Sequence, residues 1–262
     1  MEDLSEYNPI GSDLRKGQLR ILEIAKEFDS ICHKHNVTYW LMSGTLLGAR
    51  RHGGFIPWDD DFDVGVEKKD YQRLLNCLEK ELPENYKLQT RKTDSNYKHC
   101  FAKIRDLNSE IEENCTIEFG YKFNGLFIDI FPFEQICINE KIKKPLDCRY
   151  SELKYKFKKG ILWQLISKLV YYISSLVVFG LRFIGLFIVN RFSHAYGTGF
   201  YAPHKLATCF PVRKIKFEDF EFNAPNDVDQ YLIDEYGDFM ALPSREKRVN
   251  HSNKIKILDQ IR

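Results

Sequence analysis

The stretch SGTLLGARRHGGFIPWDDDFDVGV, residues 43–66, places four aspartates within five positions directly ahead of an apolar run. Like charges at this spacing repel, and a half-buried strand tolerates them only when a cation or a proton compensates. Alternate side chains of a strand share a face, so we expect Asp61 and Asp63 to project together, opposite Phe62 and Val64. The stretch therefore predicts two converging carboxylates in a buried strand.

A turn of small residues precedes the acidic block. The run Val37–Met42 is typical of a strand, and residues 46–51 begin a helix after the turn. A strand that leads into a small-residue turn and a helix N-terminus presents backbone N–H groups to phosphate. We therefore expect this segment to bind substrate, with a solvated helix face as the alternative for its basic residues; the candidates are Ser43, Gly44, Thr45, Arg50 and His52.

Two later segments add a third carboxylate and two cations. Asp129 stands alone in the apolar strand Leu126–Phe131, where an unpaired charge is costly, so it requires a metal, a cation or a hydrogen-bond donor. A second strand, over residues 100–105, carries Lys103 and Arg105 on one face. We expect both to contact substrate phosphates; an exposed face that pairs with neighbouring acids is the alternative.

Together these features describe a divalent-cation site for phosphoryl chemistry, in which Lys and Arg side chains neutralise developing charge. Magnesium prefers a few carboxylates, retained waters and phosphate oxygens. We therefore expect Asp61, Asp63 and Asp129 to bind Mg²⁺ or Mn²⁺ and to be catalytic, with Trp58 and Asp59 in support. The residues leave open whether Asp129 is a ligand or the base that takes the acceptor proton.

The composition narrows the class of protein. The 262 residues, 44% of them hydrophobic, suffice for one substantial core, and a net charge of +2 argues against nucleic acid as a partner. The seven cysteines are scattered without a CxxC pair, which indicates reduced thiols. The N-terminus lacks the basic start and apolar stretch of a signal peptide. We therefore expect a cytoplasmic protein.

The segment 141–191 has a different character, because basic clusters lead into an apolar run. From Leu169 to Val189 the only charge is Arg182, and the run is about long enough to cross a bilayer. Lys168, Ser175 and Arg182 recur every seven residues, which places polar groups on one helical face. This favours a helix lying on the inner face of a membrane, with a buried hairpin and a true span as alternatives.

Four blocks of the sequence resemble the LicD family, whose relatives include fukutin and fukutin-related protein. They are YWLMSGTLLGARRHGGFIPWDDDFDVGV, FAKIRDLNS, GLFIDIFPFE and YGDFMALPSREKRVNH. The resemblance implies an α/β (α+β) fold, a nucleotidyltransferase-like mixed sheet flanked by helices. We expect one such domain over 1–262, with a core at 12–135 and a C-terminal part at 200–262. The basic and apolar segment 141–191, which aligns with no family motif, is expected as a helical insertion.

The resemblance further implies transfer of a phosphorylated alcohol, typically phosphocholine from CDP-choline. The acceptor would be a cell-surface glycan such as lipopolysaccharide or teichoic acid, including lipid-linked forms. The family's aspartate block falls on Asp59, Asp61 and Asp63, and its third carboxylate on Asp129. Ribitol or glycerol phosphate transfer from a CDP-polyol and nucleotidyl transfer from an NTP are the alternatives. The intact acids argue against a non-catalytic scaffold, and a glycosyltransferase with a DxD metal site would usually have a nucleotide-binding Rossmann-like region before it, which this sequence lacks.

Overall fold

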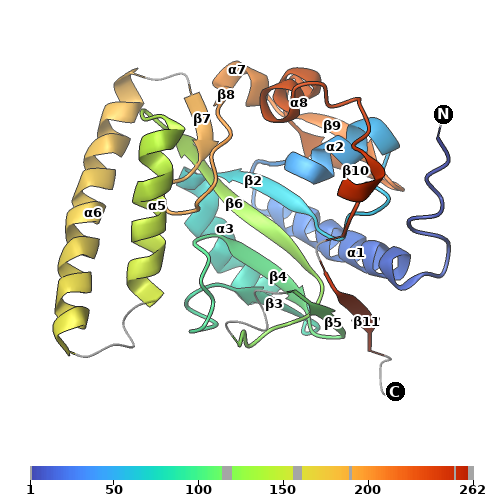
Figure 1. The fold of residues 1–262 in the computed structure, drawn as a ribbon, viewed down its shortest axis with the longest axis horizontal. Coiled ribbons are helices and arrows are strands. Elements are labelled where there is room, and N and C mark those ends of the chain that lie inside the picture. The colour runs from blue at the N-terminus through green and yellow to red at the C-terminus, as the bar shows by residue number, and fades with distance from the viewer. Residues whose placement is uncertain (1, 114–119, 156–160, 189–190, 251, 259–262) are drawn as a thin grey trace.

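The computed structural model describes residues 2–113, 120–155, 161–188, 191–250 and 252–258. A seven-stranded mixed sheet forms its centre, in the order β1-β2-β6-β4-β3, and β7 and β8 extend it beyond the end of β6 (Figure 1). Strands β2 and β6 are parallel, and the other described pairs of this sheet are antiparallel. The strands are β1 (Tyr39–Leu41), β2 (Asp63–Glu67), β3 (Tyr86–Gln89), β4 (Ala102–Asp106), β6 (Phe127–Gln135), β7 (Arg191–His194) and β8 (His204–Lys205).

Two amphipathic helices, α1 (Asp13–Lys34) and α3 (Lys68–Glu81), pack against each other and against the central sheet (Figure 1). Helix α1 begins where the Ser12 side chain accepts a hydrogen bond from the N–H of Arg15, as an N-cap does. Its apolar residues at helical spacing, among them Ile21, Ile24 and Phe28, are completely buried. This burial of one helical face against the sheet builds the main hydrophobic core.

The C-terminal part of the chain adds small elements around this core. The hairpin β9 (Arg213–Phe217) and β10 (Phe220–Ala224) packs on β1 and on α2 (Ser43–His52), beside α7 (Leu206–Cys209) and α8 (Val228–Tyr236). After the short helix η2 (Arg245–Lys247), β11 (Lys254–Ile257) pairs with β5 (Ser109–Glu112) against α1. The predicted mixed α/β architecture is confirmed.

The local prediction around the small-residue turn needs a correction. Helix α2 begins at Ser43 itself, directly after β1, so Ser43, Gly44 and Thr45 form its first turn. Ser43 has a φ of 47°, a left-handed conformation that non-glycine residues seldom adopt. The chain therefore passes from strand to helix within one residue, and this strained point lies at the predicted phosphate-binding turn.

Helices α5 (Glu140–Tyr155) and α6 (Ile161–Ile188) form a hairpin beside β6 and β7, at the left of Figure 1. Arg182 of α6 donates to Glu134 of β6 at 2.7 and 3.0 Å. Arg182, one residue of the predicted polar stripe, therefore has a partner on the sheet. Four residues of the predicted membrane segment and of the basic stretch before it lie outside the described residues: Lys156, Lys158, Lys159 and Val189.

The outward face of α6 is apolar. Its exposed side chains include Leu169, Tyr172, Leu176, Phe179, Phe183 and Phe187. A membrane-crossing length of apolar helix was nevertheless not found anywhere in the described part of the chain. A helix of 28 residues thus presents apolar side chains to the outside and a charged one to the domain.

Candidate active site

Three neighbouring strands bring two carboxylates and one ammonium group into a single row. The parallel pairing of β2 with β6 sets Asp63 opposite Asp129, and the antiparallel pairing of β4 with β6 sets Lys103 opposite Asp129. Residues directly opposite each other on paired strands share a face and have Cβ atoms about 5 Å apart. The register of the sheet therefore assembles the row Asp63, Asp129 and Lys103.

Lys103 and Asp129 form a buried ion pair. The Nζ atom of Lys103 lies 2.9 Å from Oδ1 and 3.1 Å from Oδ2 of Asp129, and 3.9 Å from Oε1 of Glu113. The same ammonium group lies 3.3 Å from the centre of the Phe127 ring. Lys103 is 4% exposed and Asp129 is 8% exposed. The partner that the lone acid of β6 requires is therefore Lys103.

The aspartates of residues 59–63 lie within electrostatic reach of this row. Burial, followed by the charges of Asp61, Asp129 and Asp59, raises the pKa of Asp63 well above its ordinary value. Burial and then Asp61 raise the pKa of Asp59, and Asp59 also shares a hydrogen bond with Asp61. Burial raises the pKa of Asp129 to about 6 against the opposing effect of Lys103. The structure thus gathers the predicted acids into one coupled group.

The first turn of α2 holds the acidic segment in place. The Thr45 hydroxyl accepts a hydrogen bond from the N–H of Asp63 at 2.8 Å. A Cβ atom on Gly44 would stand 2.9 Å from Oδ2 of Asp59, so any larger residue would displace this carboxylate from its present position. Thr45 is buried and positions the acidic segment through this hydrogen bond, while its predicted contact with substrate stays a prediction.

Asp60 differs from its neighbours because it points to the C-terminal segment. Its Oδ2 atom accepts from the backbone N–H of Ser252 at 2.9 Å and from the Ser252 hydroxyl. Asp60 is buried. One aspartate of the block is therefore structural, tying the chain near β11 to the acidic segment.

Two cavities open beside the carboxylates. One, of about 510 Å³, is lined by Ser43 and Asp63 together with His194 of β7 and Tyr236 of α8. The other, of about 520 Å³, is lined by Gly44, Trp58, Asp59 and again Tyr236. Tyr236 thus stands between the cavities, and burial together with nearby acids raises the pKa of its hydroxyl.

His194 and Tyr236 are residues that the sequence analysis missed. Burial holds the pKa of His194 well below its ordinary value, so its ring is neutral at pH 7. Tyr236 begins the block YGDFMALPSREKRVNH, which supported the family resemblance without giving any single residue a role. The last residue of that block, His251, lies outside the described residues.

Arg105 does not reach the carboxylate row, which corrects its predicted contact with phosphate. Its guanidinium donates to the Gln89 side chain at 2.8 Å, to the Gly125 carbonyl at 2.8 Å and to Glu113 at 3.0 Å. Its side chain is 0% exposed. A guanidinium with three protein partners and no exposed surface organises the interior under the row.

Arg50, His52 and Trp58 also have protein partners. Arg50 donates to Asp229 of α8 at 2.7 Å on the surface. His52 accepts from Arg51 at 2.9 Å, and its ring lies 6.3 Å from that of Trp58, edge to face. Trp58 lines a cavity together with Asp59, an acid of the cluster, and its supporting role stays a prediction.

The donor set suits a hard cation, although the described carboxylates are not arranged as a finished site. No group of three His, Cys, Asp or Glu side chains in the described residues is placed to hold a metal ion as it stands. Asp63 nevertheless lines a cavity, and its pKa is raised by burial and then by repulsion from the neighbouring acids, which a divalent cation would relieve. Oxygen ligands of this kind favour Mg²⁺ or Mn²⁺ over softer metals.

Comparison with known proteins identifies the family of this chain. The family model "LicD/FKTN/FKRP, nucleotidyltransferase domain" matches residues 36–168, about half of the chain. Lipopolysaccharide cholinephosphotransferase LicD of Haemophilus influenzae is 29% identical over 91% of this chain and 95% of its own length. Human ribitol 5-phosphate transferase FKRP is 46% identical over 55 residues, 21% of this chain and 10% of that protein. The family match spans both β2 and β6, which carry the facing carboxylates, and the chain belongs to the LicD family.

Proposed function

We propose that this chain transfers phosphocholine from CDP-choline to a glycan of the cell surface. The observation that carries the proposal is the facing pair Asp63 and Asp129, beside a cavity of about 510 Å³ in a LicD-family fold. Paired carboxylates next to a cavity suit phosphoryl transfer, in which positioning and charge neutralisation do most of the catalysis. The choice of phosphocholine and of the glycan follows the H. influenzae relative, which aligns over nearly its whole length.

We propose that Asp61 and Asp63 hold Mg²⁺ or Mn²⁺, which when bound supplies positive charge to the donor pyrophosphate. Asp129 takes the proton of the acceptor hydroxyl on a carboxylate oxygen. Its pKa of about 6 leaves it ionised at neutral pH and close to the value suited to a general base. Lys103 fixes the orientation of this carboxylate, and its charge, 2.9 Å from Oδ1, opposes a second cation there.

The direct test follows the release of CMP. Incubation of the protein and Mg²⁺ with CDP-choline, CDP-ribitol or CDP-glycerol, in the presence of glycan acceptors, should release CMP fastest from CDP-choline. Faster release from CDP-ribitol would transfer the proposal to polyol phosphate, and pyrophosphate released from an NTP would identify a nucleotidyltransferase. Omission of divalent cation, or its removal with EDTA, should abolish CMP release.

Two isosteric variants of the same segment separate catalysis from folding. Asp63→Asn should lower transfer at least about a hundredfold, because it removes a charge that acts on the reacting phosphate. Asp60→Asn should stay within a few-fold of wild type, because Asp60 faces Ser252 and the amide oxygen still accepts its hydrogen bond. Substantial turnover by Asp63→Asn would contradict the metal assignment. If Asp129→Asn binds metal and donor normally but does not transfer, the result supports Asp129 as the general base. Loss of metal binding in this variant would instead make Asp129 a metal ligand.

We further propose that α6 rests on the inner, cytoplasmic surface of an anionic membrane. The 28 residues of α6 extend about 42 Å. Its exposed side chains are largely apolar, and its charged residue Arg182 pairs with Glu134 on the sheet. The preceding chain contains Lys154, Lys156, Lys158 and Lys159, whose charges would favour anionic headgroups. This orientation would place the active site beside a lipid-linked acceptor.

Vesicle flotation tests this second proposal. The wild-type protein should float with vesicles that contain anionic phospholipid, and the variant Leu176→Asp/Phe183→Asp should stay in the soluble fraction while retaining transfer to a soluble acceptor mimic. Ile233→Asp, at a comparably exposed position on α8, is the matched control and should still float. A wild-type protein that ignores anionic vesicles would overturn the proposal. A dimer that the double variant dissociates would assign the face to a second copy.

A further inference from the structure

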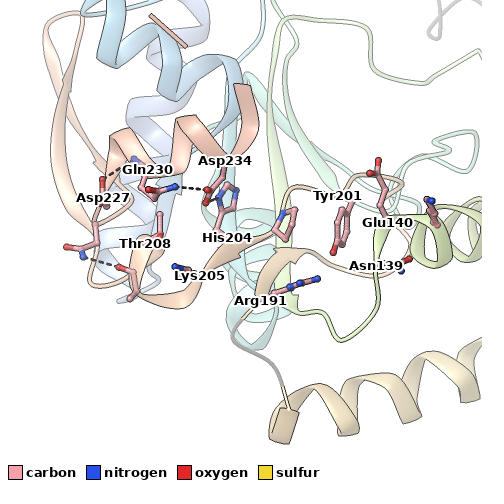
Figure 2. Close-up of a pocket in the computed structure, with 14 residues that line it drawn as sticks. Asn139, Glu140, Arg191, Tyr201, His204, Lys205, Thr208, Asp227, Gln230 and Asp234 are labelled. Atoms are coloured by element: carbon pink, nitrogen blue, oxygen red, sulfur yellow. Dashed lines mark hydrogen bonds and ion pairs between the residues drawn. The ribbon is translucent and has the colours of Figure 1, made fainter. Parts of the chain in front are cut away.

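A larger groove lies next to the carboxylate site. It has a volume of about 970 Å³ and runs between the start of α5 on one side and α7 and α8 on the other (Figure 2). Four residues line both this groove and the cavity that holds Asp63, so the two are contiguous: Glu140, Tyr201, Pro203 and Asp234. A ligand seated in the groove would therefore extend towards the reacting carboxylates.

The acids of this groove are occupied by the protein. Asp234 accepts from the Gln230 side chain at 2.8 Å and lies 3.3 Å from Nδ1 of His204 (Figure 2). Asp227 caps α8 by accepting from the backbone N–H of Gln230 at 3.0 Å. Glu140 forms an ion pair with Lys144, one turn further along α5. Glu140 is thus neutralised by Lys144, and Asp227 and Asp234 each already accept a hydrogen bond from the chain itself.

The cations of the groove are not balanced in this way. Lys141, Arg191 and Lys205 all line it and are exposed. Within the described residues, none of these three side chains has a hydrogen bond or ion pair with another group of the protein. The groove therefore offers a ligand three positively charged side chains that have no partner of their own among the described residues.

We propose that this groove binds the acceptor as an anionic glycan, whose sugars carry phosphate or carboxylate groups. Arg and Lys side chains bind such groups through charge-assisted hydrogen bonds. The ring of Tyr201 also lines the groove and supplies an aromatic surface (Figure 2). Its hydroxyl donates to the Ile138 carbonyl at 3.2 Å, which fixes the ring. The identification of this ligand as the acceptor rests on the proposed function. The preference for an anionic oligosaccharide rests on the side chains of the groove alone.

Equilibrium binding tests the groove without any transfer step. Tetragalacturonic acid should bind the wild-type protein at low salt at least tenfold more tightly than neutral maltotetraose, as measured by isothermal titration or ligand-observed NMR. The variant Arg191→Gln/Lys205→Gln should lose at least tenfold of this affinity. Lys216→Gln, which removes an exposed cation of β9 outside the groove, is the matched control and should leave it unchanged.

Three outcomes would overturn the proposal. Equal affinity for the two oligosaccharides would remove the charge preference, and an affinity that the double variant leaves intact would remove the site. Competition by CDP-choline for tetragalacturonic acid would make the groove part of the donor site. Loss of binding to anionic vesicles in the same double variant, without loss of oligosaccharide binding, would assign the cations to lipid headgroups.

Two further arms separate this proposal from the proposed function. Competition by inorganic phosphate, with the oligosaccharide preference retained, supports phosphate as well as carboxylate recognition. A wild-type protein that binds tetragalacturonic acid but releases no CMP from any donor would contradict the proposed function and leave the groove standing. Transfer activity with an acceptor KM that Arg191→Gln/Lys205→Gln does not raise would contradict the groove alone.

Discussion

Replacement of Arg105 by methionine should cost this protein a large part of its stability. The substitution keeps an unbranched, apolar side chain of similar length but removes the buried guanidinium charge. Two hydrogen bonds to neutral acceptors, Gln89 and Gly125, and one to the Glu113 carboxylate are lost. Each hydrogen bond to a neutral acceptor contributes about 1 kcal/mol and the one to the carboxylate about 2 kcal/mol, so the free energy of unfolding should fall by about 4 kcal/mol. Removal of one partner of a buried ion pair costs about 3–5 kcal/mol, which agrees with this sum.

Urea titration followed by circular dichroism measures the effect through linear extrapolation. Arg50→Met is the matched control, because Arg50 pairs with Asp229 on the surface, where the side chains are 43% and 53% exposed. It should lower the free energy of unfolding by less than about 1 kcal/mol. A loss below about 1 kcal/mol for Arg105→Met, together with a raised donor KM, would refute this reasoning and restore Arg105 as a phosphate contact.

Three further predictions concern the surroundings of the carboxylates. Gly44→Ala places a Cβ atom 2.9 Å from Oδ2 of Asp59, and the displaced carboxylate should lower kcat about ten- to a hundredfold with little change in Tm; unchanged kcat would show that the segment adapts. Asp60→Ala leaves the Ser252 N–H and hydroxyl unsatisfied, so it should cost about 1–3 kcal/mol and speed hydrogen exchange in residues 252–258; unchanged exchange there would contradict the tie. Burial, and then Arg51, lower the pKa of His52 to about 4 from an ordinary 6.5, so the unfolded chain binds more protons between these values. The stability from neutral His52 is therefore complete above pH 6.5 and lost as the pH falls towards 4; Tm measured at pH 7.5 and pH 5 should differ less in His52→Gln than in wild type, and an equal difference would exclude His52 as the cause.

The elements with a strong local period could be predicted from sequence. The apolar residues of α1 follow the helical repeat of 3.6 residues, directly after the capping residue Ser12. The side chains after Asp61 alternate with the strand repeat of 2 residues. Burial imposes these patterns within a few residues of chain, so they are present in the sequence without knowledge of any partner. The requirement of Asp129 for a compensating group followed in the same way, from the cost of a charge in an apolar strand.

Which group meets each requirement was decided by the tertiary structure. Lys103 and Arg105 lie two residues apart on one face of β4, yet their partners differ. Lys103 pairs with Asp129. The hydrogen-bond donors of Arg105 bind Gln89, Gly125 and Glu113. Arg182 likewise belongs to a polar stripe by its spacing, but only the tertiary structure places Glu134 of β6 beside it. The partners of these charges come from distant parts of the chain. Strand order and register choose them, and a local pattern contains neither.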